Sequence, residues 1–256
     1  MCLKKLNITT LILLMLIPVR LMSQDSPEDR FSRGATYFSA GDYSQALEEW
    51  TGLYSAGYRS AELEYNIGNA YFKLNNTPGA ILFFERAHLR KPADEDINYN
   101  LQIARTLVVD RLDEIPELFF VKWYNFMSLL LSSNSWAAIS LVLFVLCLIF
   151  LSVYFYSSKY KLKVAGFWLA ITAIVFSVAS LAFTIRNKDL LYESNKAIIF
   201  SPVVNGKSSP DDSGTDLFVI HEGLKVTVED EVGEWREIRL PDGNKGWVPS
   251  NSLEII

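Results

Sequence analysis

A pattern of small and aromatic residues recurs every 34 positions in the first half of the chain. The recurring pairs are Gly34 and Gly68, Tyr37 and Tyr71, Ala46 and Ala80, and Trp50 and Phe84. A third unit begins with Tyr99, Asn100 and Ala104, which repeat Tyr65, Asn66 and Ala70. This period is typical of two-helix units that stack into a solenoid. Because no unit buries its apolar face alone, the pattern predicts an all-α array over residues 26–110.

Turn-forming residues fall where such an array needs them. Thr77 is expected to cap a helix with Pro78 at its first position, and Asp94 to cap the following helix. The predicted interruptions are Gly41-Asp42, Asn75-Asn76 and Lys91-Pro92. The third unit has residues for one helix only, which predicts a terminal cap.

Residues 61–92 resemble the tetratricopeptide repeat. The matching residues are Tyr65, Asn66, Ile67, Gly68, Asn69, Ala70, Tyr71, Ala80, Phe84, Ala87 and Pro92. The first unit matches less well, since Tyr58 stands where Pro92 stands in the second. The resemblance implies an array that binds other polypeptides, with its inner surface lined by the first helix of each unit.

The helical period places a set of aromatic and amide residues on that inner surface. Their spacings of three and four put them on one face, continued by the next unit. The predicted partner-binding residues are Tyr65, Asn69, Phe72, Tyr99 and Ile103. The alternative is that Tyr65 and Asn69 only satisfy the packing and hydrogen bonds of the repeat itself.

Two long segments without charge predict membrane helices. No charged residue lies between Lys122 and Lys159 or between Lys163 and Arg186. A bilayer core about 30 Å thick needs roughly 20 apolar helical residues, and residues 136–156 and 164–185 satisfy that requirement. Half of the chain is hydrophobic and its mean hydropathy is +0.16. Two buried helices of a soluble core are the alternative.

The N-terminus indicates how these helices are oriented. Lys4 and Lys5 precede a short apolar run, and this order predicts a signal peptide over 1–23, or else an uncleaved anchor. Export of the repeats leaves residues 157–163 as a cytoplasmic turn, and its three lysines agree with the excess of basic residues on that side. Both the repeats and the C-terminal tail are then expected on the periplasmic side of a bacterial inner membrane.

An aromatic segment precedes the first predicted span. Residues 117–131 contain Phe119, Phe120, Trp123, Tyr124 and Phe126. We expect either an interfacial helix that rests on the outer leaflet or a hydrophobic cap on the last repeat.

The tail, residues 195–256, is predicted to be a small all-β barrel of five strands. Asn205-Gly206, Glu222-Gly223 and Asp242-Gly243 are its expected turns. Residues 235–254 resemble the end of a bacterial SH3-like domain. In the signalling SH3 domains an aromatic groove receives polyproline peptides, and Trp235 and Pro249 match that groove. Ser252 stands where the groove tyrosine is expected, so barrel packing is the favoured role for Trp235 and Pro249 and a ligand groove is the alternative.

No catalytic pattern is present in the sequence. His88 and His221 lie in different predicted domains without ligands at metal-binding spacing, and no phosphate-binding or dinucleotide motif occurs. The net charge of −5 argues against nucleic acid as a partner. We therefore expect a protein without enzymatic activity, cofactor or metal.

The order of the parts resembles the BatE family of the Bacteroides aerotolerance operon over nearly the full length. That resemblance implies envelope partners that carry von Willebrand A domains or further repeats, and a cytoplasmic MoxR-type ATPase. The favoured hypothesis is a membrane scaffold that holds partners in the repeat groove. The alternative is a cell-wall sensor or tether that binds peptidoglycan through the tail. The predicted parts are a signal peptide (1–23), the repeat region (26–110), an interfacial helix (117–131), a first membrane helix (136–156), a cytoplasmic turn (157–163), a second membrane helix (164–185) and the SH3-like tail (195–256).

Overall fold

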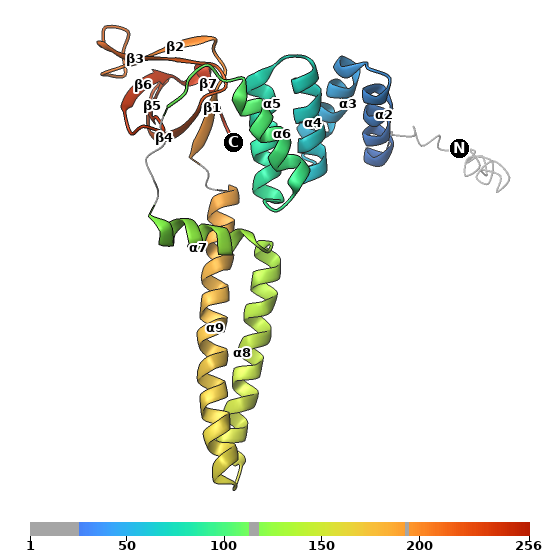
Figure 1. The fold of residues 1–256 in the computed structure, drawn as a ribbon, viewed down its shortest axis with the longest axis vertical. Helices are drawn as coiled ribbons and strands as arrows, with labels where there is room; N and C mark the ends of the chain where they lie inside the picture. The colour runs from blue at the N-terminus through green and yellow to red at the C-terminus, as the bar shows by residue number, and fades with distance from the viewer. Residues whose placement is uncertain (1–25, 113–117, 193–194) are drawn as a thin grey trace, which may run out of the picture.

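The computed structural model describes residues 26–112, 118–192 and 195–256. The signal peptide predicted for 1–23 lies outside these residues. The described chain is rich in helix and carries one seven-stranded antiparallel sheet. A helical array and the sheet lie side by side at one end of a long antiparallel helix pair (Figure 1).

Five helices form the array in antiparallel succession. They are α2 (Pro27–Ser39), α3 (Tyr43–Ser55), α4 (Ala61–Lys73), α5 (Thr77–Arg90) and α6 (Glu95–Thr106). The residues Gly41, Gly57 and Asn75 take positive φ in the turns between them. Asp94 caps α6 as predicted, with its carboxylate accepting from the Ile97 N–H. The cap of α5 is Asn76, one residue before the predicted Thr77, because its side chain reaches the Gly79 N–H.

The same close contact holds the two helices together in both complete units. A Cβ added at Gly34 lies 2.4 Å from the Trp50 ring, and one added at Gly68 lies 2.6 Å from the Phe84 ring. The glycines thus give the aromatic rings room to lie against the neighbouring backbone, as the 34-residue period predicts. Because the Trp50 ring lies close to α2, its indole N–H donates a hydrogen bond to the Phe31 carbonyl at 3.1 Å.

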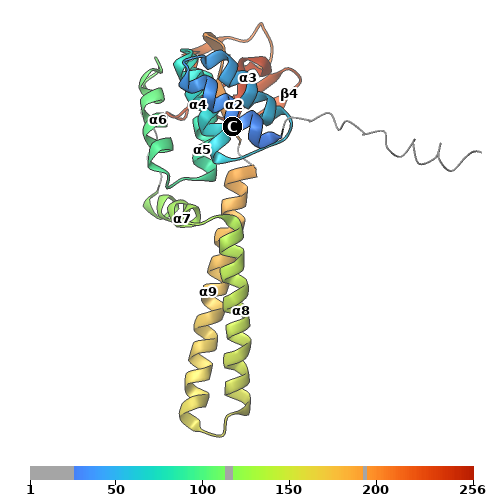
Figure 2. The ribbon, with the colours of Figure 1, turned by 90° about the vertical axis from the view of Figure 1, so that its right-hand side faces the viewer.

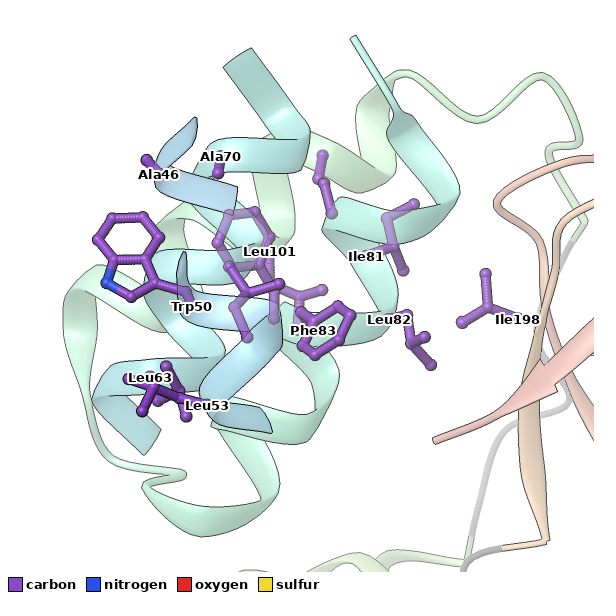
Figure 3. Packing of buried hydrophobic residues seen from close by; sticks show 14 residues of the cluster. Ala46, Trp50, Leu53, Leu63, Ala70, Ile81, Leu82, Phe83, Leu101 and Ile198 are labelled. Carbon is purple, nitrogen blue, oxygen red and sulfur yellow. The ribbon is translucent and has the colours of Figure 1, made fainter. Parts of the chain in front are cut away.

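The core of the array extends into the sheet. Trp50, Ile81, Leu82 and Phe83 belong to one buried cluster, and Ile198 from the first strand of the sheet completes it (Figure 3). Ile198 is fully buried. The array and the sheet therefore share apolar surface, although their sequences lie on opposite sides of the predicted membrane helices.

The helix pair consists of α8 (Ser133–Tyr156) and α9 (Tyr160–Tyr192). Both helices are long and apolar enough to cross a membrane. The helix α9 begins inside the predicted turn 157–163, so only residues 157–159 separate the two helices. It also continues past the predicted end at residue 185 toward the sheet (Figure 1).

A row of small residues on α9 allows the two helices to pack closely. A Cβ at Gly166 would lie 2.9 Å from the Phe150 carbonyl oxygen. The hydroxyls of Ser140 and Ser177 each donate to the carbonyl of the other residue, at 3.0 and 2.9 Å. Such reciprocal bonds satisfy polar groups where no water is available. The row is Gly166, Ala170, Ala173, Ser177, Ser180 and Thr184.

A short helix, α7 (Phe119–Leu129), crosses the end of this pair. Both views show it between the long helices and the array (Figures 1 and 2). The Tyr124 hydroxyl donates to the Ala182 carbonyl at 3.1 Å, and Arg186 donates to the Asn125 side chain at 3.0 Å. These contacts fix α7 to α9.

The sheet has two more strands than the five predicted. Its strands are β1 (Lys196–Ile199), β2 (Val203–Lys207), β3 (Asp216–His221), β4 (Lys225–Val232), β5 (Trp235–Arg239), β6 (Lys245–Pro249) and β7 (Leu253–Ile255). Their order is β3-β2-β6-β5-β4-β1-β7, so the two outer strands do not pair and the sheet is not closed. The predicted closed barrel is therefore not observed.

Two of the three predicted turns of the tail are present. Gly223 and Gly243 take φ of +84° and +94° in the turns after β3 and β5. The prediction of a turn at Asn205-Gly206 is wrong, because both residues lie in β2. Gly206 is needed there for another reason: a Cβ at this position would lie 2.1 Å from the Phe218 ring.

Replacing Gly68 with alanine is expected to destabilise α4 and α5 by about 1–3 kcal/mol, because the added methyl group overpacks the buried Phe84 ring. Hydrogen–deuterium exchange of the α4 and α5 amides measures the change. Gly52→Ala is the matched control, since its Cβ meets the Arg30 guanidinium in the first unit and no ring of α4 or α5, and alanine favours the helix. Equal protection in the two variants would contradict this account of the repeat.

Candidate functional site

Three polar residues join α4 to α6 on the predicted inner surface. The Asn100 amide group donates to the Tyr65 hydroxyl at 2.8 Å and to the Asn69 side-chain oxygen at 2.9 Å. The Tyr65 ring also packs against Phe84, with centroids 5.8 Å apart. Tyr65 and Asn69 thus hold the repeat together. Asn100, which the sequence prediction left out of the site, connects them, and its 34-residue spacing from Asn66 was the available signal.

The remaining predicted residues differ in exposure. Phe72 is partly buried against the core of the array, and Ile103 is partly exposed. Tyr99 is 66 % exposed. It occupies the position of Phe31 and Tyr65 in the earlier units, whose rings pack against Trp50 and Phe84. Among the residues that the structure describes, no aromatic ring packs against Tyr99 in the way that Trp50 and Phe84 pack against Phe31 and Tyr65, and Tyr99 is open to solvent.

The two arginines of α2 form ion pairs with one glutamate of α3 within the first unit. Arg30 donates to Glu49 at 2.9 Å and Arg33 donates to the other oxygen of Glu49 at 3.1 Å. The hydrogen bonds from Arg33 and then Arg30 lower the pKa of the Glu49 carboxyl. These two arginines are therefore engaged with Glu49.

A buried carboxylate connects the array to the sheet. Glu85 on α5 is 2 % exposed and accepts hydrogen bonds from Arg105 on α6 at 2.5 Å and from Lys225 on β4 at 2.6 Å. Burial by itself raises the pKa of Glu85, but the two cations outweigh it and lower the pKa to about 2. The carboxylate therefore stays ionised and holds the two domains together.

Two further contacts surround this buried group. Arg86 donates to the Glu254 carboxylate at 3.0 Å and to the Ile255 carbonyl at 2.6 Å. Asp110, after α6, accepts from the His221 backbone N–H at 2.6 Å and lies 2.9 Å from its ring nitrogen. Sequence analysis missed this interface, because ion pairs between residues more than a hundred positions apart leave no local pattern. A glutamate directly after Phe83 and Phe84 was the one indication of a buried charge.

The predicted groove residues of the tail lie opposite each other. Trp235 on β5 pairs in register with Pro249 on β6, and both are partly buried. Ser252 is 3 % exposed, its hydroxyl donates to the Pro249 carbonyl at 2.6 Å, and its own carbonyl accepts from Phe200. Ser252 thus closes a turn inside the domain.

Within the described ranges, no group of three or more histidine, cysteine or acidic residues is arranged to hold a metal. His88 and His221 lie apart, on α5 and at the end of β3. No family model, curated protein or solved structure matches the chain.

Replacing Glu85 alone with methionine is expected to weaken the docking of the array and the sheet by about 1.5–3 kcal/mol, because the partly exposed Lys225 then loses the charged hydrogen bond to its counter-ion. The double variant Glu85→Met with Lys225→Met removes both charges. It is expected to recover most of the lost free energy of docking, since Arg105 can turn to solvent. Energy transfer between dyes on Ser39→Cys and Asn244→Cys, followed during urea titration, measures docking. A double variant as weak as the single one would contradict the ion-pair account.

Acid is expected to separate the two domains. The pKa of Glu85 in the folded chain, about 2, lies below its ordinary value of 4.5. The contribution of Glu85 is therefore complete above pH 4.5 and is lost as the pH falls toward 2. The same dye pair should report reduced docking across this range, and Glu85→Gln should remove that part of the pH dependence. An unchanged pH profile in Glu85→Gln would assign the effect to other carboxyls.

Proposed function

We propose that the protein is a non-enzymatic membrane scaffold that binds partner proteins on the inner surface of a tetratricopeptide-type array. Two membrane spans anchor the array, and an SH3-like domain supports it. The BatE-like order of parts suggests partners in the bacterial envelope, with von Willebrand A domains or further repeats, and an indirect link to a MoxR-type ATPase.

The observation that carries this proposal is the open aromatic and amide face across α4 and α6. Tyr99 is 66 % exposed, beside the partly exposed Ile103 and the network of Tyr65, Asn69 and Asn100. In the described chain, Asn100 is the only residue bonded to the Asn69 side chain, so the Asn69 amide hydrogens are free to meet a ligand. Rigid aromatic rings beside amide donors are typical of surfaces that bind a peptide through a few strong contacts.

The sheet fits a supporting role. It supplies Ile198 to the core of the array, and its Lys225 and Glu254 bind Glu85 and Arg86 on α5. The face that carries Tyr99 is built from α4 and α6. We therefore place partner binding on the array and assign the sheet the task of holding α5 in position.

Contact between array and sheet supports a two-span topology. The chain leaves the array, passes through α8 and α9, and returns to a sheet that touches the array. Two spans bring the chain back to its starting side, which this contact requires. Lys159, Lys161 and Lys163 lie at the far end of the pair, where basic residues favour the cytoplasm. The array and the sheet then lie on the periplasmic side of the inner membrane.

The position of α7 favours the interfacial reading over a hydrophobic cap. Phe119, Trp123 and Phe126 recur on one stripe of the helix and are 83 %, 58 % and 59 % exposed. The opposite stripe, with Tyr124 and Ser128, faces α9. Exposed rings at the end of two membrane helices match the aromatic belt of a bilayer interface.

Replacing Tyr99 with alanine is expected to reduce co-purification of envelope partners from native membranes, with an affinity loss of at least ~2 kcal/mol, about 30-fold, if the ring is a binding anchor. Its high exposure predicts little change in the stability of the array. Quantitative affinity purification followed by mass spectrometry measures the recovery.

Two variants serve as controls for this experiment. Tyr58→Ala removes another exposed tyrosine, in the turn before α4, and should leave recovery unchanged. Asn69→Ala with Phe72→Ala tests the same face, but both side chains also support the repeat, so its thermal unfolding must be measured alongside. Partner recovery equal to wild type from a folded Tyr99→Ala variant would exclude this surface.

Membrane-impermeant maleimide is expected to label Asn244→Cys in intact spheroplasts and to leave Ser158→Cys unlabelled until the membrane is opened. Both positions are exposed and lie outside helices and strands. Cys147 is buried between the helices and should not react in either state. Labelling of Ser158→Cys from outside would overturn the orientation.

A further inference from the structure

A cavity of about 340 Å³ lies between the array and the end of the helix pair that α7 crosses. Residues 89–94, around the turn from α5 to α6, form one wall, and residues 129–132, between α7 and α8, form the other. Asn187 of α9 lines the cavity as well. Both views show α7 and the start of α8 below the array (Figures 1 and 2). The cavity thus lies between the helical repeat and the helices predicted to cross the membrane.

Asn187 carries a buried acceptor without a partner. The residue is 3 % exposed, and its amide nitrogen donates to the Ser128 carbonyl at 3.0 Å and to the Leu131 carbonyl at 3.2 Å. Because both of these partners are acceptors, they fix the orientation of the amide group. The side-chain oxygen of Asn187 makes no hydrogen bond in the described chain. Burying an acceptor in that state costs free energy, so the position favours a ligand that donates a hydrogen bond.

The ends of two helices add further acceptors to the cavity. The helix α5 ends at Arg90 and the helix α7 ends at Leu129, and both residues line the cavity. Within the described ranges, the backbone carbonyls of Leu89 and Arg90 accept no hydrogen bond. The last carbonyls of a helix carry its partial negative charge and favour a cation with N–H donors.

The two basic residues of the wall already have carboxylate partners. Arg90 donates to Glu64 at 2.7 Å, and the Lys91 ammonium lies 3.1 Å from the Glu62 carboxylate. Asp94 lines the cavity too, and its carboxylate accepts from the Ile97 N–H. The groups that still need a ligand are therefore the acceptors at Asn187 and at the helix ends.

An apolar surface adjoins these acceptors at the level of the proposed bilayer interface. Leu130 and Leu131 line the cavity and are 46 % and 40 % exposed. They directly follow α7, the helix whose exposed rings match that interface. A ligand with a donor-rich cationic head and an apolar body, held in the adjoining leaflet, meets both kinds of surface.

We propose that this cavity binds the primary ammonium headgroup of phosphatidylethanolamine from the leaflet beside α7. A primary ammonium has three N–H donors, which suit the Asn187 oxygen and the carbonyls at the end of α5. The choline headgroup of phosphatidylcholine has the same charge but no N–H donor, so it leaves these acceptors without a partner. A bound headgroup bridges the array to α7 and α9 and so fixes the array at the membrane surface. The inference rests on the membrane placement proposed above.

The full-length protein in nanodiscs of phosphatidylcholine provides the test. Each preparation contains the same trace of one photoactivatable lipid, with its reactive group at the glycerol end of an acyl chain. The lipids are phosphatidylethanolamine, its N-methyl derivative and phosphatidylcholine, and crosslinked peptides are mapped by mass spectrometry. We expect every lipid to mark α8 and α9. Marking of residues 89–94 and 129–132 should be strongest with phosphatidylethanolamine, weaker with the N-methyl lipid and about tenfold lower with phosphatidylcholine.

Two substitutions of Asn187 test the acceptor itself. Asn187→Leu and Asn187→Asp both lose the two hydrogen bonds that the amide nitrogen donates to α7, but only aspartate keeps an acceptor. Preferential marking of the cavity by phosphatidylethanolamine should disappear in Asn187→Leu and persist in Asn187→Asp. Equal loss in both variants, with the hydrogen exchange of α7 equally altered, would contradict the role of the Asn187 oxygen.

A second pair of variants tests the cavity without changing Asn187. Ala93 is exposed and lines the cavity, so Ala93→Trp should fill it and reduce the marking of residues 129–132 to the level of phosphatidylcholine. The matched control is Ala56→Trp, at an exposed alanine in the turn between α3 and α4 that does not line the cavity. It should change nothing.

Further arms separate the possible ligands. Equal marking by phosphatidylethanolamine and phosphatidylcholine would indicate that water alone fills the cavity, and would overturn the proposal. Equal marking by phosphatidylglycerol, which has no ammonium group, would assign recognition to Arg90 and Lys91 and overturn it likewise. Displacement by free phosphoethanolamine would indicate a soluble ligand in place of a lipid. Crosslinks on α8 and α9 but none in the cavity would refute this inference alone, and an absence on the helices as well would overturn the membrane placement.

Discussion

The arrangement of the array and the sheet depends on the ion pairs that the buried Glu85 forms. Its carboxylate lies buried between α5, α6 and β4, and it binds Arg105 from the array and Lys225 from the sheet. A buried ion pair adds little net stability compared with apolar packing, but it penalises any arrangement that leaves one charge without its partner. This penalty favours one docked position over the many that apolar contact at Ile198 would allow.

The helix pair makes that docking compatible with a membrane. The small residues of α9 and the reciprocal bonds of Ser140 and Ser177 hold α8 and α9 antiparallel. An antiparallel pair returns the chain to its starting side, where α7 is bonded to α9 through Tyr124 and Asn125. The array, the sheet and α7 therefore meet at one end of the pair, where residues of all three line a cleft.

Elements with a local cause were predictable, and elements with a distant cause were not. The contacts of Gly34 with Trp50 and of Gly68 with Phe84 follow from the repeat, and the two apolar helices follow from runs without charge. The prediction failed at Asn205-Gly206, whose turn-like sequence lies in a strand, because the Phe218 ring occupies the space where a side chain would be. The prediction of a barrel also failed, because whether the two outer strands meet depends on the arrangement of the whole sheet.

The candidate site shows the same division. The sequence alone determined the helical repeat, the face that carries Tyr65, Asn69 and Tyr99, the two long apolar helices and a tail of short strands, because periodicity, hydropathy and turn chemistry are written in neighbouring residues. Only the tertiary structure decided that Asn100 connects Tyr65 to Asn69, that Tyr99 stays exposed, and that Glu85, Asp110 and Arg86 bind the sheet. Those outcomes depend on contacts between residues 31 to 169 positions apart, and burial and charge pairing across such separations are fixed only when the chain is folded.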